Sequence, residues 1–239
     1  MLMLSIIASL LTLGLSPTPD HTIRWQGFTW HVKSGPNMGP GPCDWSDQNV
    51  WVDKSGFLHL KIDNRLGKWT SSEIWTDQAL PFGTYQCQVD GRIDQLDPNV
   101  VFSMFSYAGP DEVKEIDIEM AKWGNPKEMN AWWTVYPNDT KGKKTHTGFN
   151  LKLDGSFTTH RYTWSSTGVH YWMLGGHQPI SSSKNVIKEW DDQPAESGHS
   201  ITQTPMPLHF NLWSFEGKPP MDGKVVEIVV RSFQWVSLK

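Results

Sequence analysis

Short runs of alternating apolar and polar residues follow one another along most of the chain. In residues 58–62, three aliphatic side chains alternate with His59 and Lys61, and the same two-residue period recurs at 85–89 and 226–230. This period predicts β-strands with one buried face and, at 226–230, a strand that is apolar on most of both faces. Turn sequences that contain glycine separate the runs, and no segment shows a sustained helical period. The pattern predicts an all-β chain, a sandwich of two antiparallel sheets packed face to face.

Residues 1–15 form an apolar, uncharged segment that ends shortly before Pro17. The segment is shorter than the roughly 20 apolar residues that a membrane span requires. It is typical of the apolar region of a secretory signal peptide, and a buried N-terminal segment is the alternative. We therefore predict a signal peptide at residues 1–19 and a secreted, extracellular or periplasmic protein without stable membrane association.

The 239 residues include 21 Lys and Arg against 25 Asp and Glu, which gives a formal net charge of −4. This near balance offers no electrostatic basis for binding nucleic acid or an anionic membrane. The 14 Trp residues and the modest charge exclude a disordered chain. The length fits one domain at residues 20–239, which we expect to be a monomer. Two free thiols at Cys43 and Cys87 are favoured over a single disulfide.

A row of acidic residues is the most informative feature of the sequence. Glu115, Asp117 and Glu119 alternate with apolar residues, so in a strand the three carboxyls share one face. Like charges on one face destabilise a strand, which suggests that the three carboxyls have a functional role. Glycoside hydrolysis needs two carboxyls that flank the scissile bond, and repulsion would keep Glu119 protonated beside an ionised Glu115. A solvated acidic face or a calcium site is the alternative.

Three segments in a fixed order carry a family resemblance. Phe-Ser-Tyr-Ala-Gly-Pro stands at 105–110, Glu-Ile-Asp-Ile-Glu at 115–119 and Phe-Asn-Leu-Trp at 210–213. Together they resemble glycoside hydrolase family 16 and, within it, the bacterial lichenases, which are endo-β-1,3-1,4-glucanases. The similarity extends over most of residues 20–239. It implies a curved β-jelly roll of the concanavalin-like type, with an open cleft across its concave sheet.

The resemblance also assigns roles to individual residues. It implies Glu115 as nucleophile, Asp117 as its hydrogen-bonded helper and Glu119 as acid/base. The residues expected to contact the sugar, from the strands and loops around the acids, are Glu73, Trp75, Phe105, Trp123, Trp133, Asn211, Trp213 and Asn37. Because neighbours on a strand face opposite ways, a cleft position for Trp133 places Trp132 in the core. Trp164 and Trp235 are expected in the core or on the convex face.

Several positions depart from the lichenase pattern. Trp75 replaces a cleft Arg, Ala131 replaces an Asn, and Lys114 replaces the Asp before the first catalytic Glu. These changes affect sugar contacts and leave the three acids intact, so they put the glucan specificity in doubt. The resemblance implies no required cofactor and no catalytic metal ion. Gln234 stands where the family has an Asp ligand for structural calcium, which leaves calcium binding open.

The sequence as a whole predicts a secreted, retaining endo-β-glucanase. The form of the motif without an extra residue before the last Glu is shared by lichenases and plant xyloglucan enzymes, and it favours a mixed-linkage β-1,3-1,4-glucan as substrate. One alternative is a non-catalytic carbohydrate-binding protein on the same fold. Others are a transglycosylase, or a hydrolase of another β-glycan such as xyloglucan, laminarin or a galactan.

Overall fold

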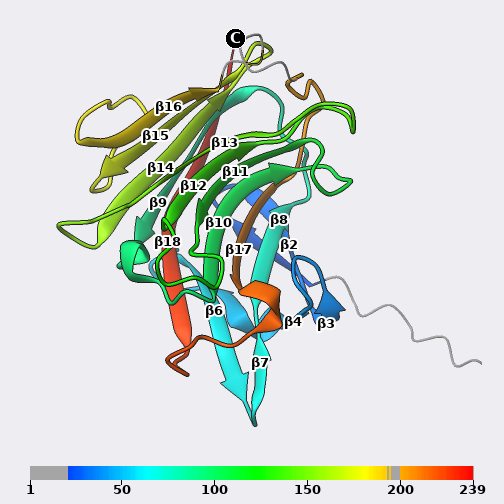
Figure 1. The fold of residues 1–239 in the computed structure, drawn as a ribbon, viewed down its shortest axis with the longest axis vertical. Coiled ribbons are helices and arrows are strands. Elements are labelled where there is room, and N and C mark those ends of the chain that lie inside the picture. The colour runs from blue at the N-terminus through cyan, green and yellow to red at the C-terminus, as the bar shows by residue number, and fades with distance from the viewer. Residues whose placement is uncertain (1–20, 193, 195–199, 239) are drawn as a thin grey trace, which may run out of the picture.

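Two antiparallel β-sheets, packed face to face, make up the protein in a computed structural model that describes residues 21–192, 194 and 200–238. We call the sheet that carries the three acids the cleft sheet and the other the back sheet. In order across the cleft sheet, the strands are β1 (Thr22–Trp25), β2 (Phe28–Val32), β8 (Ser72–Thr76), β17 (Leu208–Ser214), β10 (Val100–Tyr107), β11 (Glu115–Met120), β12 (Ala131–Val135) and β13 (Thr145–Phe149). Figure 1 shows β8, β17, β10, β11 and β12 running side by side.

The back sheet covers the inner face of the cleft sheet. Its strands, in order, are β16 (Val186–Asp192), β15 (Val169–Gly175), β14 (Phe157–Trp164), β9 (Gly83–Asp90), β18 (Val226–Ser237), β6 (Leu58–Arg65) and β5 (Val50–Val52), with β7 (Lys68–Thr70) paired to β6. A small hairpin joins β3 (Gly35–Met38) to β4 (Cys43–Trp45), and short 3-10 turns span Asp47–Asn49, Ile93–Gln95 and Phe215–Gly217. The predicted all-β jelly-roll sandwich is confirmed. In the described part of the chain, no helix is long and apolar enough to cross a membrane.

Strand alternation separates the core from the acid face of the cleft sheet. Ile116, Ile118 and Met120 of β11 are buried between the sheets, so the acids between them point the other way. Trp164 is also fully buried, as predicted, and Trp235 packs against the core while its Nε1 donates to the carbonyl of Pro81 at 3.3 Å.

The structure reverses the predicted positions of two neighbouring tryptophans. Trp133 lies opposite Ile118 in the β11–β12 pair and is fully buried, with its ring stacked on Tyr171 of the back sheet at 5.3 Å. Its neighbour Trp132 lies opposite Glu119, on the acid face. The prediction that Trp133 lines the cleft is therefore wrong, because the register of β12 against β11 places Trp132 there.

Both cysteines are buried free thiols, in agreement with the favoured interpretation. Cys87 belongs to the main core, whereas Cys43 packs in a second cluster with Trp45 and Trp213 at one end of the cleft sheet. The predicted signal peptide at residues 1–19 lies outside the described residues.

Because Trp133 joins the two sheets through its contact with Tyr171, we expect Trp133→Ala to lower the free energy of unfolding by about 3–5 kcal/mol. Urea unfolding followed by far-UV circular dichroism measures this change. The control is Trp51→Ala, since Trp51 is half-buried and stacks on His59 at 4.7 Å outside the core. Equal losses in both variants would contradict the assignment of Trp133 to the core.

Candidate active site

Cross-strand registers align side chains of neighbouring strands in rows across the cleft sheet. One row, formed by directly opposed residues, runs Glu73, Asn211, Ser103, Glu119 and Trp132. A second row runs Trp75, His209, Phe105, Asp117 and Thr134. A third begins with Tyr107 opposite Glu115, whose carbonyl accepts the backbone N–H of Tyr136 at 2.9 Å. Five adjacent strands thus bring residues distant in sequence to one surface.

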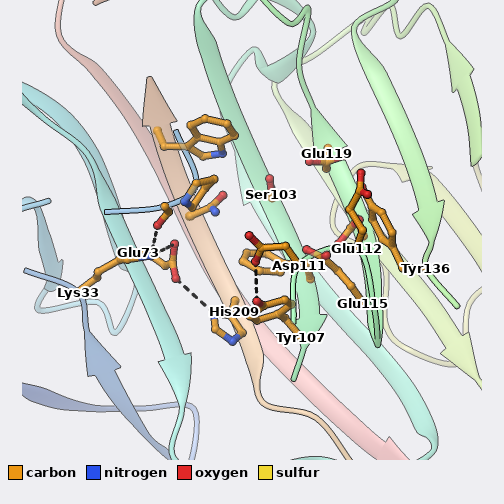
Figure 2. A pocket seen from close by; sticks show the side chains of 16 residues that line it. Lys33, Glu73, Ser103, Tyr107, Asp111, Glu112, Glu115, Glu119, Tyr136 and His209 are labelled. Atoms are coloured by element: carbon orange, nitrogen blue, oxygen red, sulfur yellow. Dashed lines mark hydrogen bonds and ion pairs between the residues drawn. The ribbon is translucent and has the colours of Figure 1, made fainter. Parts of the chain in front are cut away.

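A pocket of about 510 Å³ lies over these rows. The predicted site residues that line it are Glu73, Phe105, Glu115, Asp117, Glu119, Asn211 and Trp213. The other lining residues are Lys33, Gly39, Pro40, Ser103, Tyr107, Asp111, Glu112, Tyr136 and His209. Figure 2 shows Glu115 and Glu119 on one side of the pocket and Glu73 with Lys33 on the opposite side. A further hollow shares Asp111, Glu112 and Tyr136 with it and extends toward Lys144.

Burial governs the protonation of the three acids. It raises the pKa of Glu115 to about 8, with the charges of Glu119 and Asp111 adding to the effect. Burial also raises the pKa of Glu119 to about 7, with a small opposing contribution from Lys144. The pKa of Asp117 is raised well above its ordinary range by burial and by both glutamates. The expectation of a selectively ionised Glu115 is thus not met in the free protein, since its own pKa is raised.

Asp117 is nevertheless arranged to help Glu115 ionise. A protonated Asp117 can donate a hydrogen bond to the Glu115 carboxylate, and this interaction lowers the pKa of Glu115. The second oxygen of Asp117, Oδ1, is buried without a hydrogen-bond partner among the described residues, as is Oδ1 of Asn211. Both side chains line the pocket, so two acceptors without a hydrogen-bond partner in the described part of the chain lie beneath its surface.

The carboxylate of Glu73 contacts the side chains of Lys33 and His209. Its Oε2 lies 3.1 Å from the Lys33 ammonium, and its Oε1 lies 3.4 Å from Nδ1 of His209. Burial opposes ionisation, but these two partners outweigh it and lower the pKa of Glu73. Lys33 also donates to the carbonyl of Gly39 at 2.5 Å and lies 4.3 Å from the ring centroid of Trp45. Lys33 therefore links Gly39, in one wall of the pocket, to Glu73 on β8.

Some predicted sugar contacts lie outside the pocket lining. Trp75 is sandwiched between His31 at 5.3 Å and His209 at 6.0 Å, so neighbouring rings cover both of its faces. Trp123 packs edge-on against Phe215 at 5.6 Å. Asn37 is exposed on β3, where its backbone N–H donates to Oδ1 of Asp44 at 2.8 Å. Together with the buried Trp133, these residues are not brought to the acids.

Alternation could have revealed several pocket residues that the sequence analysis missed. Ser103 and Tyr107 share the face of Phe105 on β10, and His209 shares the face of Asn211 on β17. Asp111 comes instead from the loop before β11, where its Oδ1 accepts the Tyr107 hydroxyl at 2.7 Å, and no periodicity predicts this contact.

The described residues contain no group of three or more His, Cys, Asp or Glu side chains arranged to hold a metal ion. Gln234, at the position of the family's calcium ligand, is exposed on β18 opposite Gln86 of the back sheet.

A β-sandwich that carries paired carboxyls over a cleft is typical of enzymes that cleave glycosidic bonds. The model of glycosyl hydrolases family 16 matches residues 41–227, and the chain belongs to this family. No curated protein sequence matches the chain.

Solved structures share the fold at low sequence identity. The β-glucanase of Bacillus licheniformis is 18% identical with a TM-score of 0.64, and the match covers 92% of this chain and 100% of that one. A lichenase from a mouse hindgut metagenome is 19% identical with a TM-score of 0.62, covering 87% of this chain and 93% of that one. A pseudo β-1,3-glucanase of Mycobacterium tuberculosis is 17% identical with a TM-score of 0.65, covering 88% and 91%. The predicted resemblance to family 16 and its lichenases is confirmed.

The raised pKa values predict a pH-dependent stability. Glu115 shifts from an ordinary 4.5 to about 8, so the folded protein binds its proton more tightly than the unfolded chain does. This contribution is complete below about pH 4.5 and is lost as the pH rises through 8. We expect Glu115→Gln to flatten the decline in stability between these pH values and to raise Tm at pH 8.

Thermal unfolding at several pH values measures this effect. The control is Glu216→Gln, since Glu216 is exposed and pairs only with Lys218 among the ion pairs of the described residues. A Glu115→Gln variant that follows the wild-type pH dependence would contradict the buried, proton-retaining state of Glu115.

Proposed function

We propose that the protein is a secreted, monomeric, retaining endo-β-glucanase that hydrolyses mixed-linkage β-1,3-1,4-glucan. The observation that carries the proposal is that Glu115, Asp117 and Glu119, all from β11, line the same pocket. Family membership supports a glycoside hydrolase. The mixed-linkage substrate, the retention of anomeric configuration and the secretion of the protein are proposed in addition.

In the first step, Glu115 attacks the anomeric carbon and Glu119 gives its proton to the bridging oxygen as the glycosidic bond breaks. A sugar seated against Glu119 excludes water and supplies an acceptor oxygen, which favours the protonated form of Glu119 and leaves the negative charge on Glu115. In the second step, Glu119 removes a proton from water, the water oxygen bonds to the anomeric carbon, and the ester bond to Glu115 breaks. The hydrogen bond from Asp117 stabilises Glu115 whenever it carries the charge.

Features around the acids support an endo-acting enzyme and a glucan substrate. A second hollow shares Asp111, Glu112 and Tyr136 with the pocket, so the surface is also hollowed beyond the acids. An endo-enzyme needs such a surface because its polymer extends on both sides of the cleaved bond. A family 16 structure from Bacteroides ovatus holds a mixed-linkage product, G4G4G3G, at 13% identity and a TM-score of 0.64.

A second candidate is a non-catalytic glucan-binding protein. The observation that favours it is the shared fold of the Mycobacterium tuberculosis pseudo β-1,3-glucanase. Under this alternative, the pocket binds oligosaccharides but releases no new reducing ends.

Reducing-end assays on barley β-glucan, lichenan, laminarin, xyloglucan and a galactan test the proposal. We expect activity on the mixed-linkage glucans and a loss of at least about 1,000-fold in Glu115→Gln, since the covalent step then has no nucleophile. The control is Glu227→Gln, because Glu227 lies on β18 of the back sheet, paired with His59. Wild-type protein that binds these glucans without releasing reducing ends would favour the second candidate.

The stereochemistry of azide products separates the roles of the two glutamates. With an activated β-glycoside, Glu115→Gly should yield the α-glycosyl azide, because azide takes the place of the missing nucleophile. Glu119→Ala should yield the β-glycosyl azide, because azide attacks the intermediate held by Glu115. Exchanged products would reverse the two assignments.

A further inference from the structure

Asp111 is an exposed acid of the pocket to which the proposed mechanism gives no task. It is the middle residue of the loop at 108–114, which joins β10 to β11. The pair that closes this loop is Tyr107 opposite Glu115, the first residue of β11 and the proposed nucleophile. Directly opposed residues of adjacent strands have Cβ atoms about 4.5–5.5 Å apart. Asp111 and the nucleophile therefore belong to the same end of one β-hairpin.

The loop folds Asp111 back over the pair that closes it. At the base of the loop, the backbone N–H of Ala108 donates to the carbonyl of Lys114 at 3.2 Å, next to that pair. The Tyr107 hydroxyl then donates to Oδ1 of Asp111 at 2.7 Å, as Figure 2 shows. Both side chains line the pocket together with Glu115. The Asp111 carboxylate thus faces the pocket on the same face of the sheet as the nucleophile.

No cation pairs with Asp111 in the part of the chain that the structure describes. Its loop neighbour Glu112 differs in this respect, because the Lys144 ammonium lies 3.7 Å from Oε1 of Glu112. Asp111 instead accepts the neutral Tyr107 hydroxyl, so its negative charge stays in the pocket. The other titratable groups around Glu115 are Tyr107 on β10, Asp117 and Glu119 on β11, Tyr136 after β12 and Lys144 before β13.

A negative charge held beside a carboxyl group favours the protonated form of that carboxyl. Burial and the charge of Glu119 raise the pKa of Glu115, and the charge of Asp111 adds to their effect. Only the ionised form of Glu115 can attack the anomeric carbon. Asp111 therefore opposes the first chemical step whenever the pH is low enough for Glu115 to keep its proton.

We propose that Asp111, held in place by Tyr107, controls the pH above which Glu115 acts as a nucleophile. This inference rests on the proposed function and adds control of its pH dependence. Asp111 is a positioning residue in this role, because its charge acts through Glu115 and it needs no contact with the reacting atoms.

A competing role for Asp111 is purely structural. Its hydrogen bond with Tyr107 fixes the loop, and loss of that bond would reduce the fraction of correctly folded protein. Such a loss lowers the rate by the same factor at every pH and leaves the shape of the pH profile unchanged. Asp111→Asn separates the two roles, because an amide oxygen can still accept the Tyr107 hydroxyl while the charge is removed.

The experiment measures kcat/KM on barley β-glucan as a function of pH for the wild type and Asp111→Asn. The acidic limb of this profile reports the ionisation of the essential base, here the nucleophile, in the free enzyme. Without the charge of Asp111, Glu115 loses its proton at lower pH. We therefore expect the limb to move to lower pH and kcat/KM on it to rise about threefold. Asp154→Asn, which removes the same charge from an exposed loop before β14, should leave the limb in place.

Two further measurements show whether the effect is electrostatic and depends on Tyr107. The difference between the wild type and Asp111→Asn should shrink as the ionic strength rises from about 0.01 M to about 1 M, because the Debye length falls from about 30 Å to about 3 Å. Asp111→Asn should also move the limb less in a Tyr107→Phe background, since the hydroxyl that holds Asp111 is then missing.

An acidic limb that stays in place or moves to higher pH in Asp111→Asn overturns the proposal, as does an equal movement in Asp154→Asn. If the wild type hydrolyses no glucan, the proposed function fails, and thermal unfolding then decides on Asp111. The rise in Tm that Glu115→Gln produces should level off at a lower pH in an Asp111→Asn background, because that rise is complete once Glu115 of the folded protein is ionised. An unchanged levelling-off, or no effect of Glu115→Gln in either background, overturns the inference.

Discussion

Three buried carboxyl groups on one strand are the constraint on which the rest of the structure depends. Each would be more stable in water, and their proximity adds repulsion, so β11 must be held by other interactions. Backbone hydrogen bonds to β10 and β12 secure both of its edges. The inward side chains Ile116, Ile118 and Met120 add apolar burial against the back sheet. The site is thus one face of a strand whose other face is core, and the energetic cost of the acids is offset across the sandwich.

Glu73 illustrates how a ligand-facing group also organises its surroundings. Its two oxygens meet Lys33 and His209, whose ring stacks on Phe105 at 4.7 Å. Through these contacts, the orientation of Phe105 beside Asp117 depends on charges held two strands away. A bound sugar that approaches Glu73 must compete with Lys33 and His209 for its carboxylate oxygens. The strength of the sugar contact therefore depends on the free energy needed to break the ion pair between Lys33 and Glu73.

Much of this arrangement could be predicted from the sequence, because strand alternation is a local property. The fold class, the shared face of the three acids and the pocket positions of Phe105 and Asn211 all follow from alternation or from motifs on single strands. The predicted position of Trp133 was wrong because the face on which a side chain lies depends on the register between strands. A shift of one residue in that register moves every side chain of the strand to the opposite face of the sheet. Lys33 and Asp111 were missed for another reason, since a loop contact or a pair 40 residues apart leaves no periodic signal.

The loop that carries Asp111 and Glu112 has a consequence for the diversification of this enzyme. Both acids are exposed, and both reach the pocket from outside the hydrogen-bonded strands. The charge of Asp111 can therefore change by a single substitution that disturbs neither the core nor the strand pairing, while the electrostatic field at Glu115 changes at once. Selection can in this way adjust the working pH of the site independently of the scaffold that holds its chemistry.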